Sequence, residues 1–162
     1  MNIASTKASV TIGRDRDQFF FWFMSIDPPL FLHRYLIIPG VVGVRNQSGP
    51  MHIPGSAREL VLSDGTSTRE EILTSDPPKS IHYRITDLTN IFRYLVHEGK
   101  ADFSFTELTT GETQVDWQYA FIGHNSIAAL ILKPLVSFFW RGYMQSALTK
   151  VKQLAEGDLI AS

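Results

Sequence analysis

The segment QVDWQYAF, residues 114–121, decides the fold class because large apolar side chains alternate along it with mostly polar ones. A period of two is typical of a β-strand that buries one face and exposes the other. We therefore expect a strand here whose apolar side chains lie in the protein core. These side chains are Val115, Trp117, Tyr119 and Phe121.

The same kind of pattern extends outward from this segment along the chain. Residues 81–85 and 101–106 also alternate between large apolar and polar side chains. The pair Asp64-Gly65 is favoured in tight hairpins because both turn positions accept a positive φ. Strands that are joined by hairpins form an antiparallel sheet. The expected strands are 5–12, 41–45, 58–62, 66–74, 81–85, a long one that ends near 107, and 114–121.

Two short helices are expected after the first strand. Asp15 or Asp17 is placed to cap a helix over residues 18–26, because a carboxylate accepts hydrogen bonds from the free amides of the first turn. A second short helix over residues 30–37 ends at Pro39-Gly40, a pair that stops a helix. The chain therefore opens with one strand and two helices.

One long helix is expected after the last strand. Asn125 or Ser126 caps its start, and apolar residues recur at helical spacing to about Glu156. Pro134 lies inside this pattern and should kink the helix, because proline lacks a backbone donor. Only this helix is large enough to cover the apolar face of an antiparallel sheet. We therefore expect an α+β fold in which a curved sheet wraps around the C-terminal helix.

The composition indicates one domain over residues 1–162 and excludes several classes of function. The net charge is −1, so the chain has no basic excess and duplex nucleic acid is not an expected partner. Without cysteine, disulfides and thiolate metal sites are excluded. The apolar runs at 19–24 and 127–140 are shorter than the roughly twenty residues of a membrane span, so none is expected and the predicted location is the cytoplasm.

Sequence motifs give no sign of a metal or a cofactor, so neither is expected. The histidines are scattered, and none lies three or four residues from another. No glycine-rich phosphate loop and no Gly-x-Ser-x-Gly nucleophile elbow occurs.

Several short motifs occur in a fixed order between residues 58 and 152. Asp64-Gly65 lies in a hairpin and Tyr83-Arg84-Ile85 in the next strand, while GETQVDW at 111–117 is similar to Gly-Thr-x-Val-x-Trp with one inserted residue. The final match is WRGYMQSALTKVK at 140–152, which is similar to a terminal helix. Through these motifs the chain resembles the polyketide cyclase/dehydrase and lipid-transport group of the START-like (SRPBCC) superfamily. The resemblance implies a helix-grip fold around a hydrophobic cavity. It implies no single activity, because this fold hosts carriers, cyclases, hydrolases and ligand sensors.

Large inward-facing side chains are candidates for lining such a cavity, although they could equally fill the core. Rings with a polar tip suit an apolar pocket that has a few oriented polar groups. The candidate ligand-binding residues are Tyr83, His97, Phe103, Phe105, Val115, Trp117, Tyr119, Leu135 and Phe139.

His97 is the candidate for acid–base chemistry. Residues 97, 103 and 105 are separated by even numbers of positions along one strand, so their side chains share a face. His97 therefore points inward with Phe103 and Phe105 if no bulge intervenes near Gly99. An imidazole there could bind a carbonyl or transfer a proton near neutral pH. The alternative is a hydrogen-bonded histidine near the sheet edge.

Three segments are expected to form an entrance to the cavity. They are the loop 47–57, the irregular segment 86–92 and the apolar start of the last helix at 127–132.

Three functions remain open at this point. The leading hypothesis is that the internal cavity binds a small hydrophobic molecule, such as a lipid, a sterol-like or a polyketide-like compound. The second is a polyketide cyclase/dehydrase-type enzyme, in which His97 or a tyrosine transfers protons. The third is a protein-interaction module with a collapsed pocket. The sequence predicts no particular oligomeric state.

Overall fold

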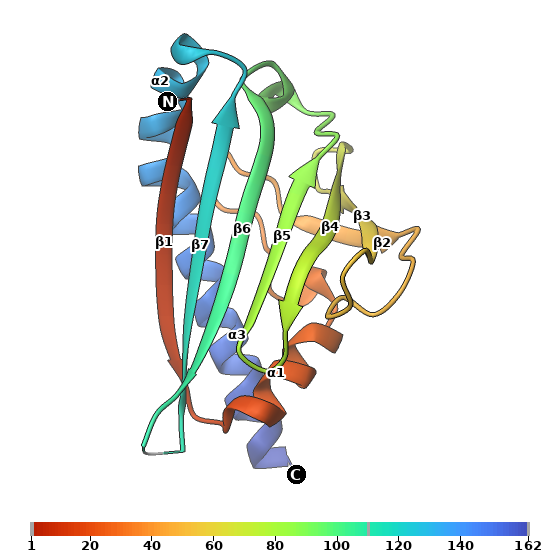
Figure 1. The fold of residues 1–162 in the computed structure, drawn as a ribbon, viewed down its shortest axis with the longest axis vertical. Coiled ribbons are helices and arrows are strands. Elements are labelled where there is room, and N and C mark those ends of the chain that lie inside the picture. The colour runs from red at the N-terminus through yellow and green to blue at the C-terminus, as the bar shows by residue number, and fades with distance from the viewer. Residues whose placement is uncertain (1, 110, 162) are drawn as a thin grey trace.

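Seven strands form one antiparallel sheet in the computed structural model, which describes residues 2–109 and 111–161 (Figure 1). Their order across the sheet is β1-β7-β6-β5-β4-β3-β2, so the first strand lies beside the last. From β2 onward, each strand pairs with the next one in the chain. The strands are β1 (Ile3–Ile12), β2 (Val41–Arg45), β3 (Ala57–Leu62), β4 (Ser67–Asp76), β5 (Ser80–Thr86), β6 (Val96–Glu107) and β7 (Thr113–Gly123).

Strand β7 shows the alternation that its sequence predicts. Val115, Trp117 and Tyr119 are buried, whereas the polar side chains between them are partly or fully exposed. Trp117 stacks on its cross-strand partner Phe103, with 4.8 Å between the ring centroids. Aromatic pairs of this kind stabilise a sheet by contact across one face. The helices cover this same face (Figure 1).

Helix α1 (Arg16–Ser25) begins slightly before the predicted range of 18–26, directly after the first of the two candidate caps, Asp15. The carboxylate of Asp15 accepts a hydrogen bond from the backbone N–H of Gln18 at 3.1 Å, so Asp15 is the N-cap. Capping of this kind satisfies one of the free amides of the first turn. The side chains that α1 buries are Phe19, Phe20 and Phe23.

The second short helix is a 3-10 turn, η1 (Pro28–Leu30), and the predicted helix over residues 30–37 is wrong. Tyr35 and Ile38 instead pair with each other through two backbone hydrogen bonds of 3.0 and 2.9 Å. Between them Leu36 has a φ of 50°, a left-handed conformation that an α-helix does not contain. The chain still opens with a strand and two short helices, and a tight loop then leads to β2.

One long helical stretch covers the face of the sheet near β1 (Figure 1). It consists of α2 (Ser126–Pro134), the π-helical segment η3 (Leu135–Trp140) and α3 (Arg141–Ala161). The side chain of Asn125 caps it by accepting a hydrogen bond from the backbone N–H of Ala128 at 2.8 Å. The π-helical segment begins directly after Pro134, which cannot donate a backbone hydrogen bond. The predicted α+β fold, a curved sheet around a long C-terminal helix, is confirmed.

By length and composition alone, the stretch Ser126–Gly157 is apolar enough to cross a membrane. This is weak evidence of a span, because the core helix of a soluble protein has the same properties. Val136, Met144 and Leu148 are buried in the same hydrophobic cluster as the sheet, which is how a core helix packs.

The packing of α1 against β6 yields a stability prediction. Phe105 is 2% exposed and contacts the rings of Phe19 and Phe20. We expect Phe105→Ala to lower the free energy of unfolding by about 3–5 kcal/mol, because it leaves a void among rings that cannot close it. Urea denaturation measures this change. The control is Phe138→Ala, which truncates a side chain in η3 that is 80% exposed and should change stability by less than about 0.5 kcal/mol. Equal effects of the two substitutions would contradict this description of the core.

Candidate functional site

A cavity of about 110 Å³ lies between the sheet and the C-terminal helix. Its walls come from the loop before β2 and from strands β2 to β7. The region of η2 (Ile91–Tyr94), α2, η3 and the first turn of α3 complete them. Most of the lining side chains are aliphatic or aromatic, as is usual for a small-molecule pocket. Close-packed protein cores contain few voids larger than a water molecule, so this space is more than a packing defect.

Five of the predicted ligand-binding residues line this cavity, and they come from both the sheet and the helix. They are Tyr83, Trp117, Tyr119, Leu135 and Phe139. A sixth, Phe103, lines a smaller neighbouring cavity of about 60 Å³.

Phe105 and Val115 are buried, but they line neither cavity. These two residues are cross-strand partners near the end of the sheet that α1 covers, and Phe105 packs on the rings of that helix. Their predicted inward direction is correct, but the structure makes them part of the core and gives them no contact with the cavity. Alternation along a strand shows which face a side chain lies on, but it does not show how far along the strand the cavity extends. Phe105 and Val115 were therefore expected at the cavity although they lie beyond it.

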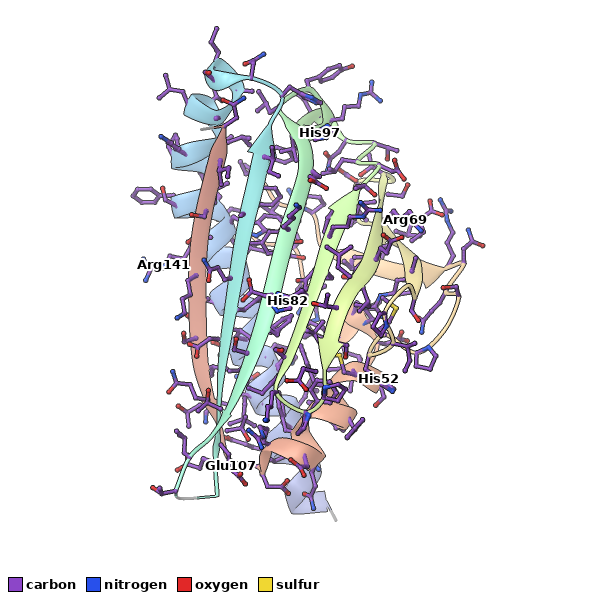
Figure 2. All side chains as sticks on the ribbon, viewed as in Figure 1. His52, Arg69, His82, His97, Glu107 and Arg141 are labelled. Carbon is purple, nitrogen blue, oxygen red and sulfur yellow. The ribbon has the colours of Figure 1, made fainter. Side chains whose placement is uncertain are left out.

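His97 points out to solvent, so its predicted inward direction is wrong. The register of β6 against β7 shifts between Val96 and Glu98, which inserts His97 as an extra residue and reverses the parity before Gly99. Val96 takes the buried position instead. The imidazole lies 5.9 Å from the ring of His124, measured between centroids, at the end of the sheet near η2 (Figure 2).

Three buried tyrosines provide hydroxyl groups at the cavity. The indole N–H of Trp117 donates to the hydroxyl oxygen of Tyr83 at 2.9 Å, and Tyr83 also interacts with Tyr119. Burial raises the pKa of both of these tyrosines well above the ordinary value, and the charge of Glu70 raises it further. Burial likewise raises the pKa of Tyr143, again with a smaller contribution from Glu70. All three hydroxyls therefore stay protonated near neutral pH and can act as hydrogen-bond donors.

Glu70 is a site residue that sequence reasoning missed. Its side chain is 12% exposed and lines both cavities. Arg58 neutralises it, with Nε at 2.9 Å and a terminal guanidinium nitrogen at 2.8 Å from the same carboxylate oxygen, Oε1. A signal did exist in the sequence. A hairpin at Asp64-Gly65 places Arg58 directly opposite Glu70, as the structure confirms, and Glu70 has the parity of buried Ile72.

Glu71, the next residue along β4, lies on the opposite face of the sheet from Glu70. It forms ion pairs with Arg84 at 2.7 Å and with Arg69 at 3.0 Å on the exposed face of the sheet. Arg84 is therefore part of a surface ion pair and does not line the cavity.

Two of the three predicted entrance segments contribute to the cavity wall. Leu88 and Phe92 come from the irregular segment, and Leu132 comes from the start of the C-terminal helix. The loop 47–57 does not line this cavity, and its Met51 lines the smaller neighbouring cavity instead. Its place is taken by residues 32–39, the loop in which the helix was expected.

Residues 23–156 match the family described as polyketide cyclase/dehydrase and lipid transport. No match to the chain is found among curated proteins.

Solved structures share the fold over nearly the whole chain. Major latex-like protein 151 from Panax ginseng has a TM-score of 0.68 at 13% identity, with 96% of this chain and 99% of that chain covered. The protein XoxI from Bacillus cereus has a TM-score of 0.64 at 16% identity, covering 94% and 95%. Ara h 8.0201 has a TM-score of 0.61 at 12% identity, covering 96% and 99%. At such low identities these likenesses show the fold alone.

The buried tyrosines predict how stability depends on pH. Because the pKa values of Tyr83, Tyr119 and Tyr143 are raised in the folded state, only unfolding lets these groups release protons near pH 10. The stability is therefore fully present below about pH 10 and falls as the pH rises above it. In an alkaline titration we expect the tyrosinate absorbance of these three residues to appear only together with loss of the near-ultraviolet circular dichroism. Their ionisation in the intact fold would contradict the burial described here.

Proposed function

The chain belongs to the polyketide cyclase/dehydrase and lipid transport family, and from this membership together with the cavity we propose that it binds a small hydrophobic molecule between the sheet and the C-terminal helix. A lipid, a sterol-like or a polyketide-like compound belongs to the class proposed. The observation that carries the proposal is a mainly apolar void bounded by strands, a loop and the C-terminal helix.

The physical basis of binding would be the transfer of apolar surface out of water. This transfer contributes roughly 25 cal/mol for each Å² that the ligand buries. The cavity offers such a surface through the aliphatic side chains of Leu135 and Val136 and the rings of Trp117 and Phe139. The neutral hydroxyl of Tyr119 can orient a polar group of the ligand without carrying a charge into the cavity.

Binding is better supported than the two alternatives. The enzyme hypothesis relied on His97 or a tyrosine for proton transfer, but His97 faces solvent and the tyrosine pKa values are too high for a base near neutral pH. The interaction-module hypothesis requires a collapsed pocket, whereas a void of about 110 Å³ is present. A cytoplasmic location remains a prediction of the sequence.

A substitution that fills the cavity tests the proposal. We expect Leu135→Trp to weaken binding of the neutral fluorescent probe N-phenyl-1-naphthylamine by roughly tenfold or more, because the larger ring occupies space that the probe needs. Fluorescence titration of the purified protein measures the affinity. Native mass spectrometry and organic extraction of the same preparation show whether a molecule is carried from the cell.

The matched control is Leu130→Trp, which makes the same change on the outer face of α2, where Leu130 is 68% exposed. It should leave the affinity within about twofold, since surface substitutions have small effects. Equal loss in both variants, or no binding of the probe to the unsubstituted protein, would contradict binding in this cavity.

A further inference from the structure

Glu70 is the only charged side chain among the buried residues of the part of the chain that the structure describes. It lies on β4 in the wall of both cavities, where the surroundings are mostly apolar. Burying a charge is costly unless it is paired, and Arg58, which is 13% exposed, provides the pair. Replacing a buried ion pair by apolar side chains of similar volume is often neutral or stabilising, so stability alone does not account for this pair.

The geometry of this ion pair leaves one carboxylate oxygen available. Both contacts from Arg58 end on Oε1. No side chain or backbone amide of the described residues donates a hydrogen bond to Oε2. A carboxylate has about four acceptor positions, and Oε2 is not among the fully enclosed polar atoms that lack a partner, so its acceptor positions are open to the space that Glu70 lines. The structure therefore contains a strong, unfilled acceptor at the cavity wall.

A donor is available at the same cavity. Tyr143, on the first turn of α3, is 5% exposed, and its hydroxyl makes no hydrogen bond with a described residue. Tyr143 and Glu70 line the same cavity, and besides burial the negative charge of Glu70 raises the pKa of Tyr143, as it does for Tyr83 and Tyr119. The cavity thus combines one carboxylate acceptor with phenolic hydroxyls, and the half-buried cation beside that carboxylate, Arg58, is already paired.

We propose that Glu70 and Tyr143 form the polar end of the cavity and select ligands that carry a neutral hydroxyl group, an alcohol or a phenol, on an apolar body. The ligand hydroxyl donates to Oε2 of Glu70, and a tyrosine hydroxyl, that of Tyr143 or Tyr119, donates to the ligand oxygen. This inference rests on the proposed function, because it specifies which hydrophobic molecules the cavity accepts.

The same arrangement disfavours charged ligands. An anionic carboxylate or phosphate would lie beside the carboxylate of Glu70 in surroundings of low polarity, where repulsion between like charges is strong. A cationic amine would add an unbalanced charge to an ion pair that is already neutral. A neutral hydroxyl gains a charge-assisted hydrogen bond without either penalty.

Three probes of the same shape test this selection: naphthalene, 2-naphthol and 2-naphthoate. Isothermal titration calorimetry at neutral pH gives the affinity of each. We expect 2-naphthol to bind at least about tenfold more tightly than naphthalene, because it adds a hydrogen bond to a charged acceptor. We expect 2-naphthoate to bind more weakly than naphthalene. If 2-naphthol binds no more tightly than naphthalene, the selection is refuted while binding in the cavity stands. If none of the three probes binds, both the selection and the proposed function fail.

Substitutions locate the selection at Glu70. The double variant Arg58→Gln/Glu70→Gln removes both charges together, so no unpaired charge remains buried. We expect it to bind 2-naphthol and naphthalene with affinities within about threefold of each other, and to weaken naphthalene binding little. The control Glu71→Gln changes the neighbouring carboxylate, which forms its ion pairs on the outer face, and should keep the full preference for 2-naphthol.

A milder variant covers the case in which the double variant does not fold. Tyr143→Phe removes one hydroxyl and keeps the ring, and we expect it to reduce the preference for 2-naphthol roughly three- to tenfold with naphthalene binding unchanged. An undiminished preference in both Tyr143→Phe and Tyr119→Phe, or in the folded double variant, would overturn the assignment.

Discussion

The register of β7 is the constraint on which the rest of the structure depends. Because β7 pairs with β1 on one side and with β6 on the other, it fixes which side chains of three strands face the helices. A slip of one residue would turn Trp117 and Tyr119 toward solvent and bring Asp116 into the core. The sheet would then lose its aromatic contacts and the cavity one of its walls. The alternation of apolar and polar residues thus fixes the register, and the register determines which side chains line the cavity.

Much of the fold could be predicted because its signals are local. Alternation along a strand and a carboxylate in front of a helix involve residues a few positions apart, so the strands were predicted, and Asp15 was one of the two caps expected for the first helix. The loop over residues 30–37 depends on distant contacts as well. Its end is held by hydrogen bonds between Gly40 and Ser63, and a helical pattern of side chains carries no information about such a contact.

The candidate site was less predictable than the fold. The alternation along the strands identified Tyr83, Trp117 and Tyr119 as cavity residues, but a single inserted residue in β6 turned His97 outward. Gly99 made a bulge possible at this place, but a glycine alone does not show that a bulge forms. Glu70 was missed because its own strand does not show that its charge is paired. A charged residue at an inward position breaks the apolar pattern of its own strand, and only the opposite strand shows its partner, Arg58. Glu70 can therefore be recognised only when the two strands are considered together.

The pairing of the first strand with the last has a consequence for biosynthesis. Ile12 lies opposite Thr113, and Ile3 lies opposite Ile122. Until β7 has been synthesised, β1 has no partner strand and stays an unpaired, partly apolar segment. Contacts between such remote positions slow folding, because a large loop must close before they form. The nascent chain therefore completes its sheet only after β7 has been translated, and until then β1 presents unpaired backbone groups of the kind that can pair with another chain.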